Sequence, residues 1–268
     1  MKQGWLLVAV LALSLTACSR NGSTPTSGTT SAPAAQEAAA PRAQTLAAPE
    51  PGADRGDASL ERLTGLPESA QLPAGRWKAG VNYQPVVPAQ ATSATPGQVE
   101  VLEVFWYGCS HCYALDPVLE RWRQTKPAYV KFVRVPVIWD QGPHRAHARL
   151  FYTLEALGKL DALHTLVFDT VQKGGNFLVD SDEAKTFRLQ LAFAKSQGIA
   201  EADFTREYNG FYVGSALQRA DDLTRRYSVD TVPRIVVNGK YQTDVGMAGS
   251  PEQLIQLIND LAAAEKKR

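Results

Sequence analysis

The strongest constraint on the fold is a Cys-x-x-Cys pair placed where an apolar stretch gives way to a helical pattern. Residues 99–107 are mostly β-branched and aromatic, with Glu103 in the middle, and predict a buried strand. Cys109 and Cys112 come directly afterwards, in the first turn of an amphipathic pattern that covers 109–124. The sequence therefore predicts a strand that runs straight into a helix whose start carries a dithiol.

A helix start is a reactive place for a cysteine. Its first backbone N–H groups are unpaired and the helix dipole is positive there, so the thiolate form of Cys109 is favoured. Cys109 is the candidate nucleophile, and Cys112, one turn further along, can attack a mixed disulfide on Cys109 and release the partner. His111 lies between them, and its imidazole should favour the thiolate further and make the disulfide more oxidising.

Other interpretations of these residues stay open at this point. A zinc site needs about four ligands, and His144 and His147 are the histidines that could complete one with the cysteine pair. A purely structural disulfide is the weakest alternative, because a two-residue spacer closes almost no loop. His111 could also be a surface histidine without a tuning role.

The order of the remaining elements indicates the fold. Residues 129–138 predict a second strand, which must run parallel to the first because a helix connects the two. Helical patterns then dominate up to the next strand. Asp180-x-x-Glu183 resembles a capping box and predicts a helix start at 180. The expected helices cover 145–157, 159–171, 180–197, 201–208 and 215–227.

The C-terminal part predicts a hairpin and a last helix. Asn238-Gly239 is typical of a two-residue turn that would join strands at 234–237 and 241–243. Ser250 is a good N-cap for a helix over 251–265. A β-α-β unit, a helical insert, a hairpin and a final helix together predict an α/β thioredoxin fold that carries a helical lobe.

Three separated motifs, in this order, resemble the DsbA family of periplasmic thiol:disulfide oxidoreductases. They are 103–112 (EVFWYGCSHC), Thr231-Val232-Pro233 and 237–241 (VNGKY). The resemblance covers about 75–268 and implies a thioredoxin domain with a helical insertion at about 143–228. It also implies that the redox-active disulfide is the only reactive group, with no other cofactor and no metal.

The resemblance further implies roles for residues outside the dithiol. An acid at the position of Glu103 lies behind the dithiol and exchanges the proton of the buried Cys112. The bond before Pro233 is cis, and this proline faces the dithiol. Together with Thr231 and Val232 it offers a short backbone edge on which an extended substrate segment can pair.

Residues next to the cysteines complete the expected substrate surface. Ser110 stands where DsbA itself has proline, and Trp106 precedes the dithiol. Core packing is the default expectation for most members of a group of aromatic residues. They are also candidates for an apolar substrate surface: Trp106, Tyr107, Tyr113, Trp139 and Phe177.

The N-terminus has the pattern of an export signal. Lys2 is followed by an apolar stretch at 5–15 that is too short to span a membrane. Leu15-Thr16-Ala17-Cys18 resembles the lipobox of bacterial lipoproteins, which implies a signal peptide at 1–17 and a lipid on Cys18. The alternative is a plain secretory signal with an incidental cysteine.

Residues 18–74 are rich in Ala, Pro, Ser, Thr and Gly and predict a disordered linker, because they cannot bury enough apolar surface to fold. With a lipid on Cys18, the domain would be tethered on the periplasmic side of the cell envelope. Ser19 follows Cys18, and by resemblance to lipoprotein sorting rules this favours the outer membrane over the inner one.

Charge and cysteine count narrow the function. The formal net charge is +1, which gives no basis for nucleic-acid binding. The chain has 3 cysteines, so one lipidated residue and one active pair leave none for structural disulfides. We expect a monomeric oxidoreductase.

We expect it to donate the Cys109–Cys112 disulfide to exported proteins and to be reoxidised by a DsbB-type membrane quinone reductase. The alternatives are an isomerase or reductase on the same fold, and a non-enzymatic envelope lipoprotein that binds unfolded chains.

Overall fold

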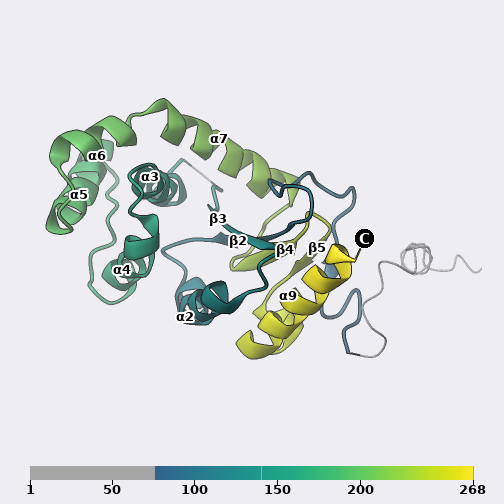
Figure 1. Ribbon diagram of the computed structural model, residues 1–268. Helices are drawn as coiled ribbons and strands as arrows, with labels where there is room; N and C mark the ends of the chain where they lie inside the picture. The colour runs from purple at the N-terminus through teal and green to yellow at the C-terminus, as the bar shows by residue number, and fades with distance from the viewer. Residues whose placement is uncertain (1–75, 140, 268) are drawn as a thin grey trace, which may run out of the picture. The chain divides into compact units, whose positions relative to one another are not determined.

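The computed structural model describes residues 76–139 and 141–267, and a mixed sheet forms the centre of this part of the chain (Figure 1). Its strands lie in the order β1-β5-β4-β2-β3. β2 and β3 are parallel, whereas β4 is antiparallel to β2 and to β5, and β1 is antiparallel to β5. The strands are β1 (Gln84–Pro85), β2 (Val99–Phe105), β3 (Val130–Pro136), β4 (Arg234–Val237) and β5 (Tyr241–Thr243).

Helices connect and cover these strands. α2 joins β2 to β3, and α3 to α7 are inserted between β3 and β4. This order confirms the predicted thioredoxin fold with a helical insertion. The helices are α2 (Ser110–Thr125), α3 (Pro143–Ala156), α4 (Leu160–Gln172), α5 (Glu183–Ser196), α6 (Glu201–Tyr208), α7 (Phe211–Arg226), α8 (Val245–Ala248) and α9 (Pro251–Lys266).

The helix expected from residue 180 begins three residues later. The carboxylate that caps α5 belongs to Asp182, which accepts the N–H of Lys185 at 2.8 Å. Asp180 accepts the N–H of Asp182 at 2.9 Å and thus stabilises the turn before the helix. The predicted capping box at Asp180 was therefore wrong. Asp180, Ser181 and Asp182 can each cap a helix, and their spacing in the sequence does not determine which of them does so.

Other differences concern short elements and one helix start. α7 begins at Phe211 rather than at 215, and Gly210 is its N-cap. β1 and α8 are only 2 and 4 residues long, too short for any periodic pattern to show in the sequence. The predicted hairpin turn is confirmed, since Asn238 and Gly239 have φ values of 51° and 67°.

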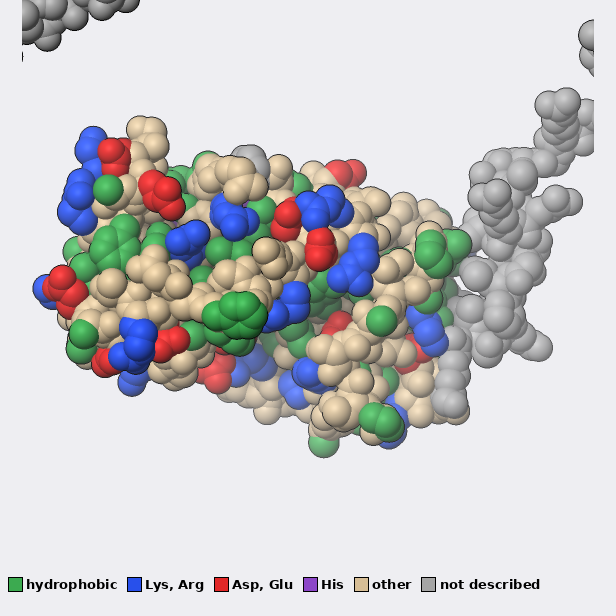
Figure 2. All heavy atoms as spheres, turned by 90° about the horizontal axis from the view of Figure 1, so that it is seen from above, with side chains coloured by type: hydrophobic (Ala, Val, Ile, Leu, Met, Phe, Trp, Pro, Cys, Tyr) green, Lys and Arg blue, Asp and Glu red, His purple; other side chains and the backbone are tan. Residues whose placement is uncertain are grey.

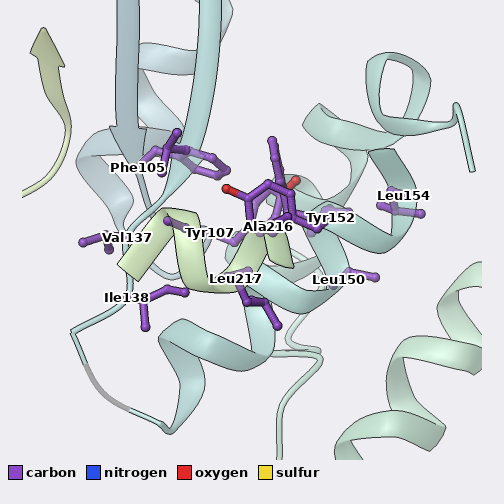
Figure 3. Close-up of a cluster of buried hydrophobic side chains, with 14 of the residues drawn as sticks. Phe105, Tyr107, Val137, Ile138, Leu150, Tyr152, Leu154, Ala216 and Leu217 are labelled. Carbon is purple, nitrogen blue, oxygen red and sulfur yellow. The ribbon is translucent and has the colours of Figure 1, made fainter. Parts of the chain in front are cut away.

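The two faces of the sheet carry two hydrophobic clusters. Val99 and Val101 of β2 belong to a cluster with α2 and α9, whereas Leu102 and Val104 belong to one with the inserted helices. In Figure 1, α2 and α9 lie below the sheet and α3 and α7 above it. Figure 3 shows part of the second cluster, where the strand end at Phe105 meets side chains of α3 and α7.

Charge is spread evenly on the face that Figure 2 shows, where basic and acidic side chains alternate and no large basic field forms. Among residues 76–139 and 141–267, no helix is long and apolar enough to cross a membrane. Cys18 and the expected signal and linker lie outside the described residues.

Candidate active site

The dithiol lies at the start of α2, as predicted. Cys109 is the N-cap, and its Sγ accepts the backbone N–H of Cys112 at 3.3 Å. The Cys109 N–H donates to the carbonyl oxygen of Trp106 at 3.0 Å, which closes the turn between β2 and the helix. Both cysteines are free thiols in this structure, with Cys109 half-buried and Cys112 fully buried. One sulfur is thus accessible to a partner and the other is not.

The surroundings lower the pKa of Cys109 to about 6. The largest cause is a hydrogen bond from the Cys112 thiol, which stabilises the thiolate against the opposing effect of partial burial. The backbone N–H groups of Cys112 and His111 act in the same direction, and the charge of His111 is the last contribution. His111 is exposed at the helix start, so solvent screens its charge.

The pKa of Cys112 moves in the opposite direction. Burial raises it well above its usual range, and the hydrogen bond to Cys109 and the negative charges of Cys109 and Glu103 raise it further. At neutral pH the reduced pair therefore holds a thiolate at Cys109 and a protonated thiol at Cys112. This asymmetry is what the candidate nucleophile and its buried partner require.

The loop before β4 brings the predicted substrate edge to the dithiol. Cys109 Sγ lies 3.4 Å from the carbonyl oxygen of Val232, to which its protonated form can donate, and the peptide bond between Val232 and Pro233 is cis. A cavity of about 340 Å³ opens beside this contact. It is lined by His111, Ala114, Leu115, Thr231, Val232, Pro233, Asp244, Val245, Gly246 and Pro251.

Aromatic side chains border the dithiol on the other side. The Trp106 ring stacks on His144 with centroids 4.3 Å apart and meets Phe177 edge-on at 6.1 Å. Phe177 and Trp139 are 39% and 42% exposed, so part of this aromatic group faces solvent. Gly108 permits the arrangement, because a Cβ there would overlap the Trp106 indole.

Tyr107 does not belong to this surface. It is fully buried, and its ring packs edge-on against Phe105 and Phe168 in the cluster of Figure 3. Tyr107 therefore follows the default expectation of core packing and is not part of a substrate surface, because the strand end turns this side chain into the helical lobe. Tyr113 is half-buried, and its hydroxyl donates to Asp169 at 2.6 Å. Ser110 is exposed beside Cys109.

Glu103 lies behind the dithiol, as the resemblance implied. The parallel register of β2 and β3 sets it opposite Arg134, and Arg134 Nε donates to Glu103 Oε2 at 2.9 Å. Burial nevertheless raises the pKa of Glu103 to about 7, against the lowering effect of Arg134. The negative charges of Asp116 and Glu120 raise it further. Glu103 can therefore gain or lose a proton near neutral pH.

Sequence reasoning missed the residues around Glu103. Arg134 Nη2 lies 2.7 Å from Glu120 Oε1 and 3.5 Å from Asp116 Oδ1, so one guanidinium faces three carboxylates. His164 of α4 reaches the same cluster, with Nε2 at 3.3 Å from Asp116 Oδ1. One signal was available, since Asp116 falls on the apolar face of α2 and a buried acid needs a partner.

The histidines considered as zinc ligands lie elsewhere. Nε2 of His147 contacts the carbonyl oxygen of Phe177 at 2.8 Å, and His144 stacks against Trp106. In the part of the chain that the structure describes, no three His, Cys, Asp or Glu side chains gather as metal ligands would. The geometry around the dithiol is that of a thiol-exchange site.

Known proteins share both the sequence and the fold. The chain is 37% identical over 204 residues to thiol:disulfide interchange protein DsbA of Pseudomonas syringae pv. tomato, covering 76% of this chain and 90% of the relative. The chain belongs to the DsbA family. DsbA of Pseudomonas aeruginosa PAO1 is 37% identical over 171 residues, which cover 64% of this chain and 78% of the relative.

The structural comparison agrees. The crystal structure of Pseudomonas aeruginosa DsbA matches with a TM-score of 0.64 at 35% identity, covering 73% of this chain and 96% of that structure. No family model matches the chain. DsbA proteins are periplasmic thiol:disulfide oxidoreductases that work through a redox-active disulfide and need no external cofactor. The protein is therefore an enzyme of this class, which decides against the interpretation as a non-enzymatic binding lipoprotein.

Proposed function

We propose that Cys109 and Cys112 form the disulfide that this protein donates to exported proteins during oxidative folding. The observation that carries the proposal is the opposite displacement of the two pKa values, about 6 for Cys109 and far above the usual range for Cys112. A stabilised Cys109 thiolate favours the reduced form of the protein, and a protein that prefers to be reduced is an oxidant.

The exchange proceeds in two attacks. A substrate thiolate attacks Cys109 Sγ, the Cys109–Cys112 bond breaks, and its electron pair leaves on Cys112, which then takes a proton. A second substrate thiolate attacks the substrate sulfur of the mixed disulfide and releases Cys109 as a thiolate. The substrate gains a disulfide and loses two electrons, which the protein now holds as its dithiol.

Other residues of the site support these attacks. Glu103 is the proton donor to Cys112, and the charge of His111 favours Cys109 as the leaving thiolate. The Val232 carbonyl lies 3.4 Å from Cys109, so an extended substrate segment paired along Thr231, Val232 and Pro233 would hold its thiolate at that sulfur. Trp106 and Ser110 flank the same place.

Renewed oxidation needs an acceptor for two electrons. We propose a DsbB-type membrane quinone reductase as this partner, acting on the same half-buried but accessible Cys109. We also propose that a lipid on Cys18 anchors the enzyme on the periplasmic side of the cell envelope, with the outer membrane favoured by Ser19. Changing Cys18 to Ser should then release the protein from the membrane fraction into the soluble periplasmic fraction, and unchanged membrane association would contradict the anchor.

The decisive experiment is the equilibrium of the dithiol with glutathione. The dithiol of an oxidase should remain reduced until the glutathione buffer is strongly oxidising. Its equilibrium constant for oxidation by glutathione disulfide should therefore be well below that of a reductant such as thioredoxin. An equilibrium constant in the thioredoxin range would instead indicate a reductase. Changing both Cys109 and Cys112 to Ala must abolish the exchange.

A further inference from the structure

A buried row of polar groups connects the helical lobe to the carboxylates behind the dithiol. The Tyr107 hydroxyl lies 2.9 Å from His164 Nδ1, and His164 Nε2 lies 3.3 Å from Asp116 Oδ1. The Thr165 hydroxyl donates to the other Asp116 oxygen at 2.8 Å. Tyr107, His164 and Asp116 are each at most 1% exposed, so water does not compete for these contacts.

The contacts determine which nitrogen of His164 carries the proton. Burial raises the pKa of Tyr107, which keeps its phenol protonated, so the hydroxyl donates to Nδ1. Burial also lowers the pKa of His164, which keeps the imidazole neutral. The single ring proton is then on Nε2, and the nearest carboxylate oxygen to this nitrogen is Asp116 Oδ1 at 3.3 Å. Nε2 makes no hydrogen bond of regular geometry with any described residue, so this ion-pair contact with Asp116 is the interaction open to its proton.

Asp116 is in turn coupled to Glu103. Both carboxylates contact Arg134, Asp116 at 3.5 Å and Glu103 at 2.9 Å, and Glu120 contacts it at 2.7 Å. Hydrogen bonds from His164 and Thr165 hold the pKa of Asp116 below its usual range, although burial opposes them. The resulting charge on Asp116 is among the causes that raise the pKa of Glu103.

We propose that His164 is a positioning residue for the proton transfer at Cys112. Its Nε2–H faces Asp116 Oδ1 and keeps that carboxylate ionised, and the charge on Asp116 adds to the burial that lets Glu103 hold a proton at neutral pH. The inference rests on the proposed function, in which Glu103 protonates Cys112 when the disulfide opens. A residue of the inserted lobe thereby sets the pH range in which the dithiol of the thioredoxin domain works.

Among the described residues, the charged or titratable groups that face this path belong to four elements. They are Glu103 and Tyr107 at β2 and its end, Arg134 on β3, Cys109 at the start of α2, Cys112, Asp116, Glu120 and Arg123 on α2, and His164 on α4. When the Cys109–Cys112 bond breaks, the electron pair remains on Cys112 and the Glu103 proton moves to it. Glu103 is left ionised against Arg134.

The experiment is a pH series, between pH 5 and 9, of the equilibrium of the full-length protein with glutathione. Changing Glu103 to Gln identifies the inflection that Glu103 causes, expected near its pKa of about 7. His164→Phe should move this inflection to lower pH by about one unit, because Asp116 then takes a proton and no longer opposes ionisation of Glu103. His164→Gln should restore it, since the amide N–H can replace Nε2–H.

Tyr107→Phe is the matched control, because it removes the hydrogen bond at Nδ1 while the Asp116 carboxylate, 3.3 Å from Nε2, still favours the ring proton on Nε2. It should lower stability without moving the inflection. An unmoved inflection in His164→Phe, or an equal shift in Tyr107→Phe, would overturn the role of His164. A wild-type protein that exchanges no disulfide would refute the proposed function itself, which is a different result.

A measurement on the unmodified protein covers the case in which His164→Phe does not fold. Nitrogen NMR shifts of His164 distinguish its two neutral tautomers from the protonated ring. We expect the Nε2–H tautomer between pH 7 and 8, because burial lowers the pKa of His164. A proton on Nδ1, or a titration of His164 within that range, would contradict the proposal.

Discussion

Arg134 donates a hydrogen bond to Glu103 at 2.9 Å from the neighbouring parallel strand, and both side chains are almost completely buried. The pair is directly in register, so the backbone of the sheet holds the guanidinium beside the carboxylate. Asp116 and Glu120 contact the same guanidinium, so three carboxylates share one positive charge. Arg134 therefore stabilises the ionised form of Glu103 only in part. A buried acid with an incomplete partner is therefore placed next to Cys112.

This arrangement predicts how stability depends on pH. The pKa of Glu103 rises on folding from 4.5 to about 7, so between these values the folded state binds a proton that the unfolded state releases. The contribution of Glu103 to stability is present below this window and is lost as the pH rises through it, by up to about 3 kcal/mol. In Glu103→Gln, the free energy of unfolding should decrease less between pH 5 and 8 than it does in the wild type.

Denaturant unfolding of the reduced protein at a series of pH values measures this effect. Glu252→Gln is a suitable control, because Glu252 is exposed and should leave the pH dependence unchanged. Parallel curves for the wild type and Glu103→Gln would show that Glu103 is ionised in the folded protein at low pH already.

Trapping of mixed disulfides tests whether Cys109 is the nucleophile and Cys112 the resolving cysteine. Cys112→Ala leaves Cys109 able to form a mixed disulfide and removes the buried thiol that would resolve it, so covalent complexes with exported proteins should accumulate. Non-reducing gels of periplasmic extracts measure them. Cys109→Ala should give none, since Cys112 is fully buried and out of reach of a substrate. Equal trapping by both variants would contradict the assignment of Cys109 as the nucleophile.

His111 should have a modest effect on Cys109. Its charge is the last of the causes that lower the pKa of Cys109, after the Cys112 hydrogen bond and the backbone N–H groups. We expect His111→Ser to raise this pKa by less than about one unit and to make the protein less oxidising. The thiolate absorbance of the reduced protein as a function of pH measures the change. A pKa equal to that of the wild type would remove His111 from the tuning residues.

Gly108 and Gly214 provide a matched pair of substitutions. A Cβ at Gly108 would overlap the Trp106 indole, so Gly108→Ala should destabilise the protein by about 1–3 kcal/mol and displace the indole from His144. A Cβ at Gly214 meets no atom within 4 Å, and Gly214 lies inside α7. Gly214→Ala should therefore stabilise the protein by about 0.5–1 kcal/mol. Thermal unfolding measures both, and a neutral Gly108→Ala would show that Trp106 is free to move.

Local patterns determined much of the fold. The apolar run of β2, the dithiol at the start of α2 and the Asn238-Gly239 turn were all predictable from neighbouring residues. Periodicity, capping and turn chemistry act over a few residues, so the sequence contains what is needed to recognise them. The start of α5 was missed because the competition between Asp180 and Asp182 depends on the path of the preceding loop.

Some features of the candidate site could likewise be predicted from the sequence, and others depend on the tertiary structure. The sequence by itself identified Cys109 as the candidate nucleophile, Cys112 as its candidate resolving partner, and the need of Glu103 for a partner. Tertiary structure alone decided that Arg134 is that partner, since the strand register places it opposite Glu103, and that α4 brings His164 to Asp116. It also turned Tyr107 into the core. The physical reason is that the pKa values of buried groups depend on charges a few ångströms away in space, and those charges come from distant parts of the chain.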